Sequence, residues 1–282
     1  MTVDPKPMDA DELAALRSTA RKMRRLILEA AHRAGAGHTG GALSIVEILA
    51  VLYRRILRID PARPRWEARD RFILSKGHAA IALYAALALR GYFPEERMCE
   101  FDHVDGMLQG HPDMLKTPGV DMSTGALGQG LSAGIGMALG ARRSGIDCRV
   151  FVLLGDGEMQ EGQVWEAVMY AGFHKVDRLI GIIDANGLQL TGRTRDILNL
   201  EPLPDKLRAF GWETFECDGH DLAALKETLR RAAAVENQPA MLIARTEKGH
   251  GISFMADRVE WHAKAPDADE FQAALRELEC AD

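Results

Sequence analysis

Two short motifs place oxygen-bearing side chains at the ends of apolar runs. Gly155-Asp156-Gly157 directly follows the apolar run 150–154, and Asp184-Ala185-Asn186 follows the run 179–183. Short β-branched runs are typical of buried parallel strands, and open α/β sheets bind ligands at the carboxyl ends of such strands. A carboxylate and an amide oxygen suit Mg²⁺ or Ca²⁺, while the glycines let a diphosphate approach the backbone. The pair predicts a metal–diphosphate site, and the alternative is two ordinary strand-to-helix turns.

These motifs need a sheet to hold them, and the rest of the chain alternates strand and helix signals. Apolar residues at helical spacing predict helices over 9–33, 44–56, 79–89, 131–143, 163–173 and 222–235. Short apolar runs predict strands over 71–74, 150–154, 179–183, 212–217 and 241–246. This alternation predicts an α/β fold with a doubly wound, mostly parallel sheet flanked by helices. The Gly-rich segments 34–41 and 107–130 are expected to be loops, and a long loop inside a domain is usually functional.

Four histidines lie in glycine-containing or loop settings: His38, His78, His111 and His262. If their loops converge on the carboxyl edge of one sheet, they form a polar site for a hydroxylated or phosphorylated substrate. The sequence has no His-x₃-His or Cys/His ligand spacing, which argues against zinc. The surface or capping histidines are expected to be His32, His103, His174 and His220, and the role of His250 stays open.

Two glutamates and a glycine-rich loop complete the polar segments. Glu161 and Glu166 lie on the first turns of a predicted helix, where an acidic side chain in water complements the helix dipole. The loop 123–130 enters the predicted helix 131–143 and could bind a phosphate at its N-terminus. The sequence contains neither a Walker A motif nor a strand-linked Gly-x-Gly-x-x-Gly, which disfavours a P-loop or a Rossmann dinucleotide site.

Composition excludes several classes of protein. The 282 residues are 47% hydrophobic and 27% charged, with a net charge of −6. Mixed charge of this kind gives no footprint for nucleic acid, and no apolar stretch is long enough to span a membrane. We expect one α/β domain over residues 1–282, with 1–12 as a flexible tail and no secretory signal. The four scattered cysteines fit reduced thiols in a cytoplasmic protein.

Together, these motifs resemble the N-terminal, diphosphate-binding domain of transketolase. The resemblance extends from Leu13 to Pro266 and keeps the order of the family's motifs. Those motifs are 37–38, 74–78, 110–112, 124–130, 155–157 with 160–162, 184–186 and 261–262. The resemblance implies the thiamine diphosphate-binding fold and identifies the expected diphosphate as that of thiamine.

The resemblance also implies a role for each matching residue. The metal, Mg²⁺ or in its place Ca²⁺ or Mn²⁺, would be bound by Asp156, Asn186 and the carbonyl of Leu188. The expected cofactor contacts are His78, Gly125, Ala126, Leu127, Gly155, Asp156, Gly157, Glu158, Asn186 and His262. The expected catalytic residues are His38, His111, His262 and Glu161, and Glu161 and Glu166 are expected at a dimer interface.

The family's reaction passes a two-carbon ketol unit from a ketose phosphate to an aldose phosphate. In the family a second domain activates the cofactor's pyrimidine ring, and this sequence matches only the first. We therefore expect an alpha subunit that works with a C-terminal subunit carrying the pyrimidine-binding and C-terminal domains, in an α2β2 assembly. The alternatives are a subunit related to 1-deoxyxylulose-5-phosphate synthase and a non-catalytic thiamine diphosphate-binding module. The two sugars stay open.

Overall fold

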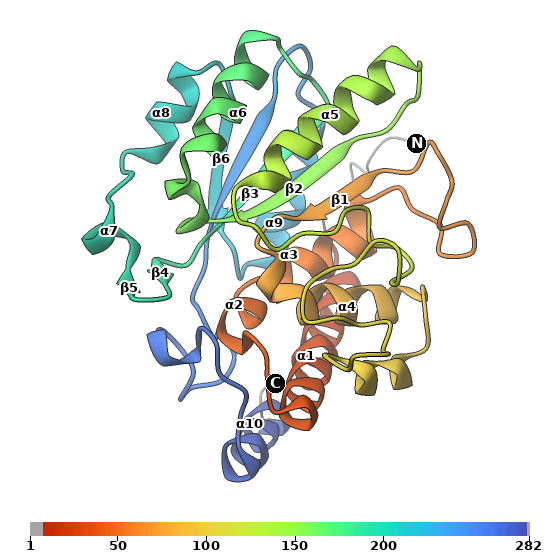
Figure 1. The fold of residues 1–282 in the computed structure, drawn as a ribbon, viewed down its shortest axis with the longest axis vertical. Coiled ribbons are helices and arrows are strands. Elements are labelled where there is room, and N and C mark those ends of the chain that lie inside the picture. Colours follow the sequence, from red (N-terminus) through yellow and green to blue (C-terminus); the bar gives the residue numbers. More distant parts are fainter. Residues whose placement is uncertain (1–7, 281–282) are drawn as a thin grey trace.

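Five parallel strands form the central sheet of the computed structural model, which describes residues 8–280 (Figure 1). Their order across the sheet is β1-β2-β3-β7-β6. Their bounds are β1 Arg71–Leu74, β2 Val150–Gly155, β3 Leu179–Ala185, β6 Glu213–Asp218 and β7 Ala240–Arg245. Because all five strands run in one direction, their carboxyl ends lie along one edge. All five predicted strands are present, close to their predicted bounds.

Helices cover both faces of the sheet, and the side chains of β1, β2, β3 and β7 alternate between two cores. Phe151 and Leu153 of β2 pack into one core, while Val150, Val152 and Leu154 pack into the other. Every one of these side chains is fully buried, as expected for a strand between two helical layers. The predicted doubly wound α/β architecture is therefore confirmed.

The longer helices mostly agree with the sequence prediction. Their bounds are α1 Ala10–Ala34, α3 Val46–Val51, α4 Ala80–Arg90, α5 Gln129–Arg143, α6 Gly162–Phe173, α8 Leu203–Ala209, α9 Leu222–Ala233 and α10 Ala268–Cys280. The short elements are α2 Thr39–Leu43, α7 Thr194–Ile197, β4 Leu188–Gln189 and β5 Gly192–Arg193. A π-helical turn, Leu52–Ile56, follows α3. The sequence prediction did not include α2, α7, α8 or α10.

Two sequence predictions about the N-terminal part need correction. Residues 1–7 of the expected flexible tail lie outside the described residues, but residues 10–12 already belong to α1. Asp9 caps this helix, since its side chain accepts a hydrogen bond from Glu12 N at 2.9 Å. The expected loop 34–41 also overlaps α2, whose residues Thr39–Leu43 are all buried. Within residues 8–280, no helix combines the length and apolar character that crossing a bilayer requires.

Candidate active site at the carboxyl edge of the sheet

The two motifs of the predicted metal site meet because β2 and β3 pair in parallel. Their register places Gly155 beside Asp184, and Asp156 N donates to Asp184 O at 3.2 Å. The Asp156 carboxylate accepts hydrogen bonds from Gly157 N at 2.9 Å and from Gly187 N at 2.8 Å. Strand pairing therefore brings together two segments that lie about 30 residues apart in the sequence.

Asn186 and Leu188 follow β3 and point their polar groups at the same region. The Asn186 amide nitrogen donates to Asp184 Oδ2 at 2.8 Å, and its oxygen accepts from Leu188 N at 3.0 Å. These two bonds fix the orientation of the amide. Asp156, Asn186 and Leu188, the three predicted metal ligands, all line one cavity of about 260 Å³.

This cavity, which we call the cofactor cavity, contains most of the predicted cofactor contacts. Its lining is Gly41, Lys76, His78, Leu127, Gly155, Asp156, Gly157, Glu158, Gln160, Glu161, Asn186, Leu188, Gln189, Leu190, Lys248 and His262. Gly125 and Ala126 do not line it and are exposed on the loop before α5. Glu166 also lies outside it, exposed on α6.

The four histidines lie close together, as expected if their loops converge at the edge of the sheet. The ring of His38 lies 5.1 Å from His78, 6.3 Å from His111 and 5.7 Å from His262, measured between centroids. The rings of His78 and His262 are 5.2 Å apart. His111 also contacts the glycine-rich loop, because a Cβ on Gly125 would lie 3.4 Å from its Cδ2.

Three of these imidazoles are neutral at neutral pH. Burial lowers the pKa of His78 to about 2, and the positive charge of Lys76 adds to the effect. Burial and Lys248 lower the pKa of His262 to about 4, and burial followed by His111 lowers the pKa of His38. A neutral imidazole can donate one hydrogen bond and accept another, so this cluster can orient hydroxyl groups and exchange protons with them.

Sequence reasoning did not assign a role to the ion pair between Lys76 and Asp184. The Lys76 ammonium lies 2.6 Å from Asp184 Oδ2, and both side chains are almost completely buried. Ser44 Oγ donates to the same carboxylate oxygen at 2.7 Å, and the Thr246 hydroxyl donates to the other. Burial opposes ionisation of Asp184, but Lys76, together with the hydroxyls of Thr246 and Ser44, holds the pKa of the carboxyl below its usual value.

Lys248 is a second buried cation that the sequence reasoning missed. Its side chain is 2% exposed, and its ammonium donates to the carbonyl oxygen of Leu188 at 3.1 Å. The same ammonium lies 2.9 Å from His262 Nδ1. Burial and the charge of Lys76 lower the pKa of Lys248 to about 8. The only signal in the sequence was a lysine just after a predicted buried strand, at the edge where the other motifs end.

Glu158 and the glycine-rich loop form a framework beneath the cavity. The Glu158 carboxylate accepts hydrogen bonds from Ser75 Oγ at 2.5 Å, Gly128 N at 2.8 Å and Gly155 N at 3.0 Å. Ser75 Oγ also accepts from Gly130 N at 3.2 Å. Amides at the start of α5 are therefore already bonded to side chains of the protein, which argues against the phosphate site expected at that N-terminus.

Comparison with known proteins decides the family. A family model described as the thiamine diphosphate binding domain of transketolase matches residues 16–280. The chain belongs to the transketolase family. It therefore carries a thiamine diphosphate-binding domain, and the cofactor cavity is where the family's motifs converge.

Two relatives match this transketolase-family chain over almost their whole length. The 6-deoxy-6-sulfo-D-fructose transketolase subunit SqwG of Clostridium sp. (strain MSTE9) is 45% identical over 264 residues, which cover 94% of this chain and 96% of that protein. One subunit of the apulose-4-phosphate transketolase of Actinobacillus succinogenes is 45% identical over 276 residues, 98% of this chain and 99% of that protein. The solved transketolase from Leishmania mexicana has a TM-score of 0.88 at 28% identity, and the match covers 94% of this chain but 41% of that one.

The donor set of this transketolase-family site suits a divalent cation beside a diphosphate. Burial and the nearby Asp184 raise the pKa of Asp156 to about 6, so the protein alone makes this carboxylate costly to ionise, and a cation would offset that cost. In the same lining, Lys76, Lys248 and the neutral imidazoles supply hydrogen-bond donors for phosphate oxygens. Gln189 Oε1 is buried in the lining without a hydrogen-bond partner among the described residues.

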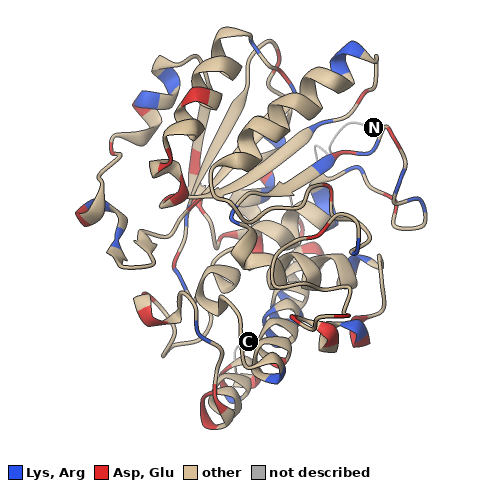
Figure 2. Ribbon diagram, in the orientation of Figure 1, with Lys and Arg blue, Asp and Glu red and all other residues tan. Residues whose placement is uncertain are grey.

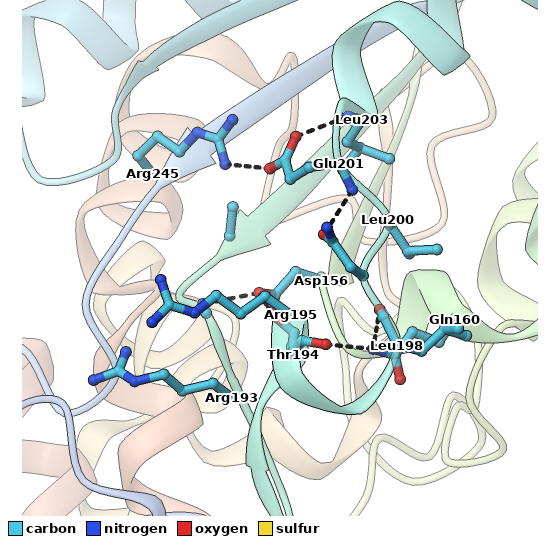
Figure 3. Close-up of a pocket in the computed structure, with 13 residues that line it drawn as sticks. Asp156, Gln160, Arg193, Thr194, Arg195, Leu198, Leu200, Glu201, Leu203 and Arg245 are labelled. Atoms are coloured by element: carbon cyan, nitrogen blue, oxygen red, sulfur yellow. Dashed lines mark hydrogen bonds and ion pairs between the residues drawn. The ribbon is translucent and has the colours of Figure 1, made fainter.

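A second cavity, of about 230 Å³, shares Asp156 with the cofactor cavity (Figure 3). Thr194 lines this second cavity, and its hydroxyl donates to Asp156 Oδ2 at 3.1 Å. Three arginines also line it, and each is paired with a carboxylate: Arg193 with Asp257 at 2.8 Å, Arg195 with Asp196 at 3.6 Å and Arg245 with Glu201 at 3.1 Å. These pairs leave no excess positive charge, so the arginines do not make this cavity an anion site.

Proposed function

We propose that this chain is the N-terminal subunit of a heteromeric transketolase. The complex would transfer a two-carbon ketol unit from a ketose, typically phosphorylated, to an aldose. The main support is the cofactor cavity, in which two carboxyl-edge motifs, two buried lysines and the histidine cluster converge. The SqwG protein and the apulose-4-phosphate transketolase chain, which both match nearly end to end, are named as transketolase subunits, which supports a partner chain for this one as well.

The residues of this chain would hold and orient the cofactor. Asp156, Asn186 and the Leu188 carbonyl would bind Mg²⁺, for which Ca²⁺ or Mn²⁺ could substitute. Lys248, which lines the same cavity, would donate to the diphosphate together with His78 and His262. When bound, thiamine diphosphate supplies the carbanion and the electron sink for cleavage of the donor.

The histidine cluster would position the sugar. The rings of His111 and His262 lie 6.3 Å and 5.7 Å from that of His38, and the lowered pKa values of His38 and His262 keep those two imidazoles neutral. A neutral imidazole can take the proton of the donor hydroxyl that becomes the carbonyl of the first product, and give a proton to the carbonyl oxygen of the acceptor aldose, which becomes a hydroxyl. The two relatives are named for different sugars, 6-deoxy-6-sulfo-D-fructose and apulose-4-phosphate, so similarity to them does not assign a substrate to this chain.

We propose that the C-terminal subunit covers the mouth of the cofactor cavity. Apolar side chains are exposed on the loops beside His111 and α5: Val104 at 86%, Met114 at 50%, Leu115 at 89% and Leu127 at 37%. Leu127 also lines the cavity itself, so a chain bound here would complete the walls of the site. The partner would supply the pyrimidine-binding domain, which none of the residues described here provides.

A second surface would bring two copies of this chain together in an α2β2 assembly. Helices α5 and α6 pack side by side on one face of the sheet, and they are almost free of charged residues (Figures 1 and 2). Helix α6 exposes Met169 at 51%, Tyr170 at 46% and Phe173 at 81%. Glu161 lines the cofactor cavity and Glu166 is exposed further along, on α6. A second copy on this face would place the glutamates of both chains between the two active sites.

The chain alone should show no ketol transfer, and activity should appear when the partner is added. The test is to purify the chain with and without the product of the adjacent reading frame. Each sample is assayed with Mg²⁺, thiamine diphosphate, a ketose phosphate and an aldose phosphate. Full activity from the chain alone would refute the need for a partner. Cofactor binding by the complex without any turnover would instead favour a non-catalytic module.

Replacing Phe173 with glutamate should split the assembly at the α5–α6 face. A carboxylate placed in an apolar interface loses its hydration without gaining a partner, which costs several kcal/mol. We expect the mass measured by light scattering to fall from that of α2β2 to that of αβ. Ile197→Glu is the matched control, because Ile197 is exposed at 44% but lies on α7. An unchanged mass for Phe173→Glu would show that another surface joins the copies.

A further inference from the structure

The loop after β7 carries Lys248 into the cofactor cavity, and contacts outside the cavity hold it in place. Glu247 N donates to His220 Nε2 at 2.8 Å, and the carbonyl oxygen of His250 accepts from Arg24 Nε at 3.1 Å. The residues on either side of Lys248 and Gly249 are therefore both tied to other parts of the fold. Gly249 N also donates to Gly40 O at 3.0 Å.

The carboxylate of Glu47 connects Arg24 and His220, the two residues that hold the loop from outside the cavity. Glu47 on α3 pairs with Arg24 Nη2 at 2.5 Å through one oxygen and with His220 Nδ1 at 3.0 Å through the other. The exposed fractions of the three side chains are 7% for Glu47, 8% for Arg24 and 14% for His220. Burial opposes ionisation of Glu47, but Arg24 and then His220 outweigh it and lower its pKa to about 2. Glu47 is therefore charged at any working pH.

We propose that Arg24, Glu47 and His220 form a clamp that positions Lys248 for the diphosphate. None of the three residues lines the cofactor cavity, so they act on the site only through the loop. This inference rests on the proposed function, since it takes Lys248 to be a ligand of the cofactor.

The loop needs such a clamp because its glycines allow its backbone many conformations. Gly249 and Gly251 both have left-handed backbones, with φ of 77° and 89°, and glycine gains the most conformational freedom when it is released. A Cβ on Gly251 would lie 2.4 Å from Arg24 Nε, so the glycine packs directly on the clamp. The ammonium of Lys248 also faces repulsion from Lys76, which opposes its placement in the cavity. Fixing the loop from outside offsets both effects.

Two of these side chains also belong to a possible metal site. Glu47, His220 and His250 each place one ligand atom within 4.8 Å of the other two. The hydrogen bonds argue against this reading. His220 Nε2 accepts from Glu247 N, so the ring proton is on Nδ1 and faces Glu47. A metal bound to Nδ1 of His220 would require the ring proton to be on Nε2. There it would face the N–H group of Glu247, and neither group would have an acceptor. The positive charge of Arg24 beside Glu47 also disfavours a cation.

Two isosteric substitutions separate the two hydrogen bonds of His220. Asparagine can place its amide nitrogen near the Nδ1 position and keep the bond to Glu47. Glutamine can place its amide oxygen near the Nε2 position and keep the bond to Glu247 N. In the complex with the partner chain, His220→Asn should raise the Kd for thiamine diphosphate, measured with Mg²⁺, on the order of tenfold, the effect of one lost hydrogen bond. His220→Gln keeps the bond to the loop but loses the link to Glu47, so it should raise the Kd less than His220→Asn does, with kcat at saturating cofactor unchanged in both variants.

Hydrogen exchange without cofactor gives a second readout. His220→Asn should remove protection from the amides of residues 247–251, and His220→Gln should keep it. Protection and a Kd in His220→Asn that equal those of the unmodified chain would overturn the clamp. So would uptake of one Zn²⁺, added alone, by the unmodified chain but not by His220→Asn, since that result would assign a metal site.

A double substitution shows whether His220 acts through Lys248. Lys248→Met should raise the Kd on its own, and His220→Asn should then add no further increase, because the group that it positions has been removed. Additive increases would overturn the clamp and leave the proposed function intact. An unchanged Kd for Lys248→Met would instead refute the role given to Lys248 in the proposed function, and the clamp with it.

Discussion

Replacing Asp156 with alanine is expected to abolish the Mg²⁺-dependent binding of thiamine diphosphate, and ketol transfer with it. Asp156 is the only carboxylate among the three proposed metal ligands, because Asn186 and the Leu188 carbonyl are neutral. Residues that only support a metal ligand commonly contribute 10–100-fold to affinity or activity. Loss of the charged ligand itself should therefore reduce metal affinity by at least about 100-fold. The measurement is cofactor binding by the complex, titrated with Mg²⁺, alongside the rate of ketol transfer.

The control for this experiment is the same substitution, aspartate to alanine, at a different position. Asp196→Ala removes a carboxylate whose side chain is 69% exposed on α7, outside the cofactor cavity, and should leave metal and cofactor binding unchanged. A second variant, Asp156→Asn, keeps the volume but removes the charge and one of the two accepting oxygens, so it should fail as the alanine variant does. Undiminished turnover in either Asp156 variant would refute the metal assignment.

The central strands of the fold were predictable because they are continuous apolar runs, whereas the edge strand β6 mixes polar and apolar residues. A strand buried on both faces must be apolar at every position, and the runs 150–154 and 179–183 are. The helix α2 was not predictable in the same way. Its sequence Thr39–Leu43 contains two glycines, which disfavour a helix, and only the complete burial of all five residues explains why it forms. Tertiary packing overrides local preference there.

The positions of site residues that directly follow a strand could be predicted from the sequence. The pairs between residues that are distant in the sequence could not. The carboxyl ends of parallel strands lie at one edge, so Asp156 and Asn186 had to be neighbours. The pair Lys76–Asp184 joins residues 108 positions apart, and no spacing rule indicates it. His220 looked like a surface residue because its partner, Glu47, lies 173 positions away. Polar pairs between residues this far apart in the sequence can be identified only from a structure.

The second large effect expected is on stability. Replacing Lys76 with methionine should lower the free energy of unfolding of the apo chain by about 3–5 kcal/mol, the usual cost of leaving one buried charge unpaired. Asp184 is 0% exposed, so without Lys76 its remaining hydrogen bonds would come from neutral donors such as Ser44 and Asn186. Chemical denaturation of the chain without cofactor measures this effect apart from any role of Lys76 in binding.

The pH dependence of this loss follows from the sign of the pKa shift. In the unmodified chain Lys76 holds the pKa of Asp184 below its usual value, so the pair stabilises the fold above the unfolded pKa of about 4 and the effect is lost as pH falls through the folded pKa. In Lys76→Met the buried carboxyl has lost the cation that is paired with it, so its pKa must rise. Asp184 then takes up a proton as the pH falls, so the deficit should be largest at neutral pH and shrink toward about pH 4.

The variant Lys76→Met/Asp184→Asn separates the loss of the pair from the loss of packing. It removes both charges and keeps the volumes close to those of the original side chains, so no unpaired ion is left in the core. It should be more stable than Lys76→Met at neutral pH, with a coupling energy between the two sites of at least about 1 kcal/mol. Its stability should also lack the pH dependence of the single variant. Additive losses would mean that Lys76 and Asp184 stabilise the fold independently, and the ion pair would then not be what holds this edge of the sheet together.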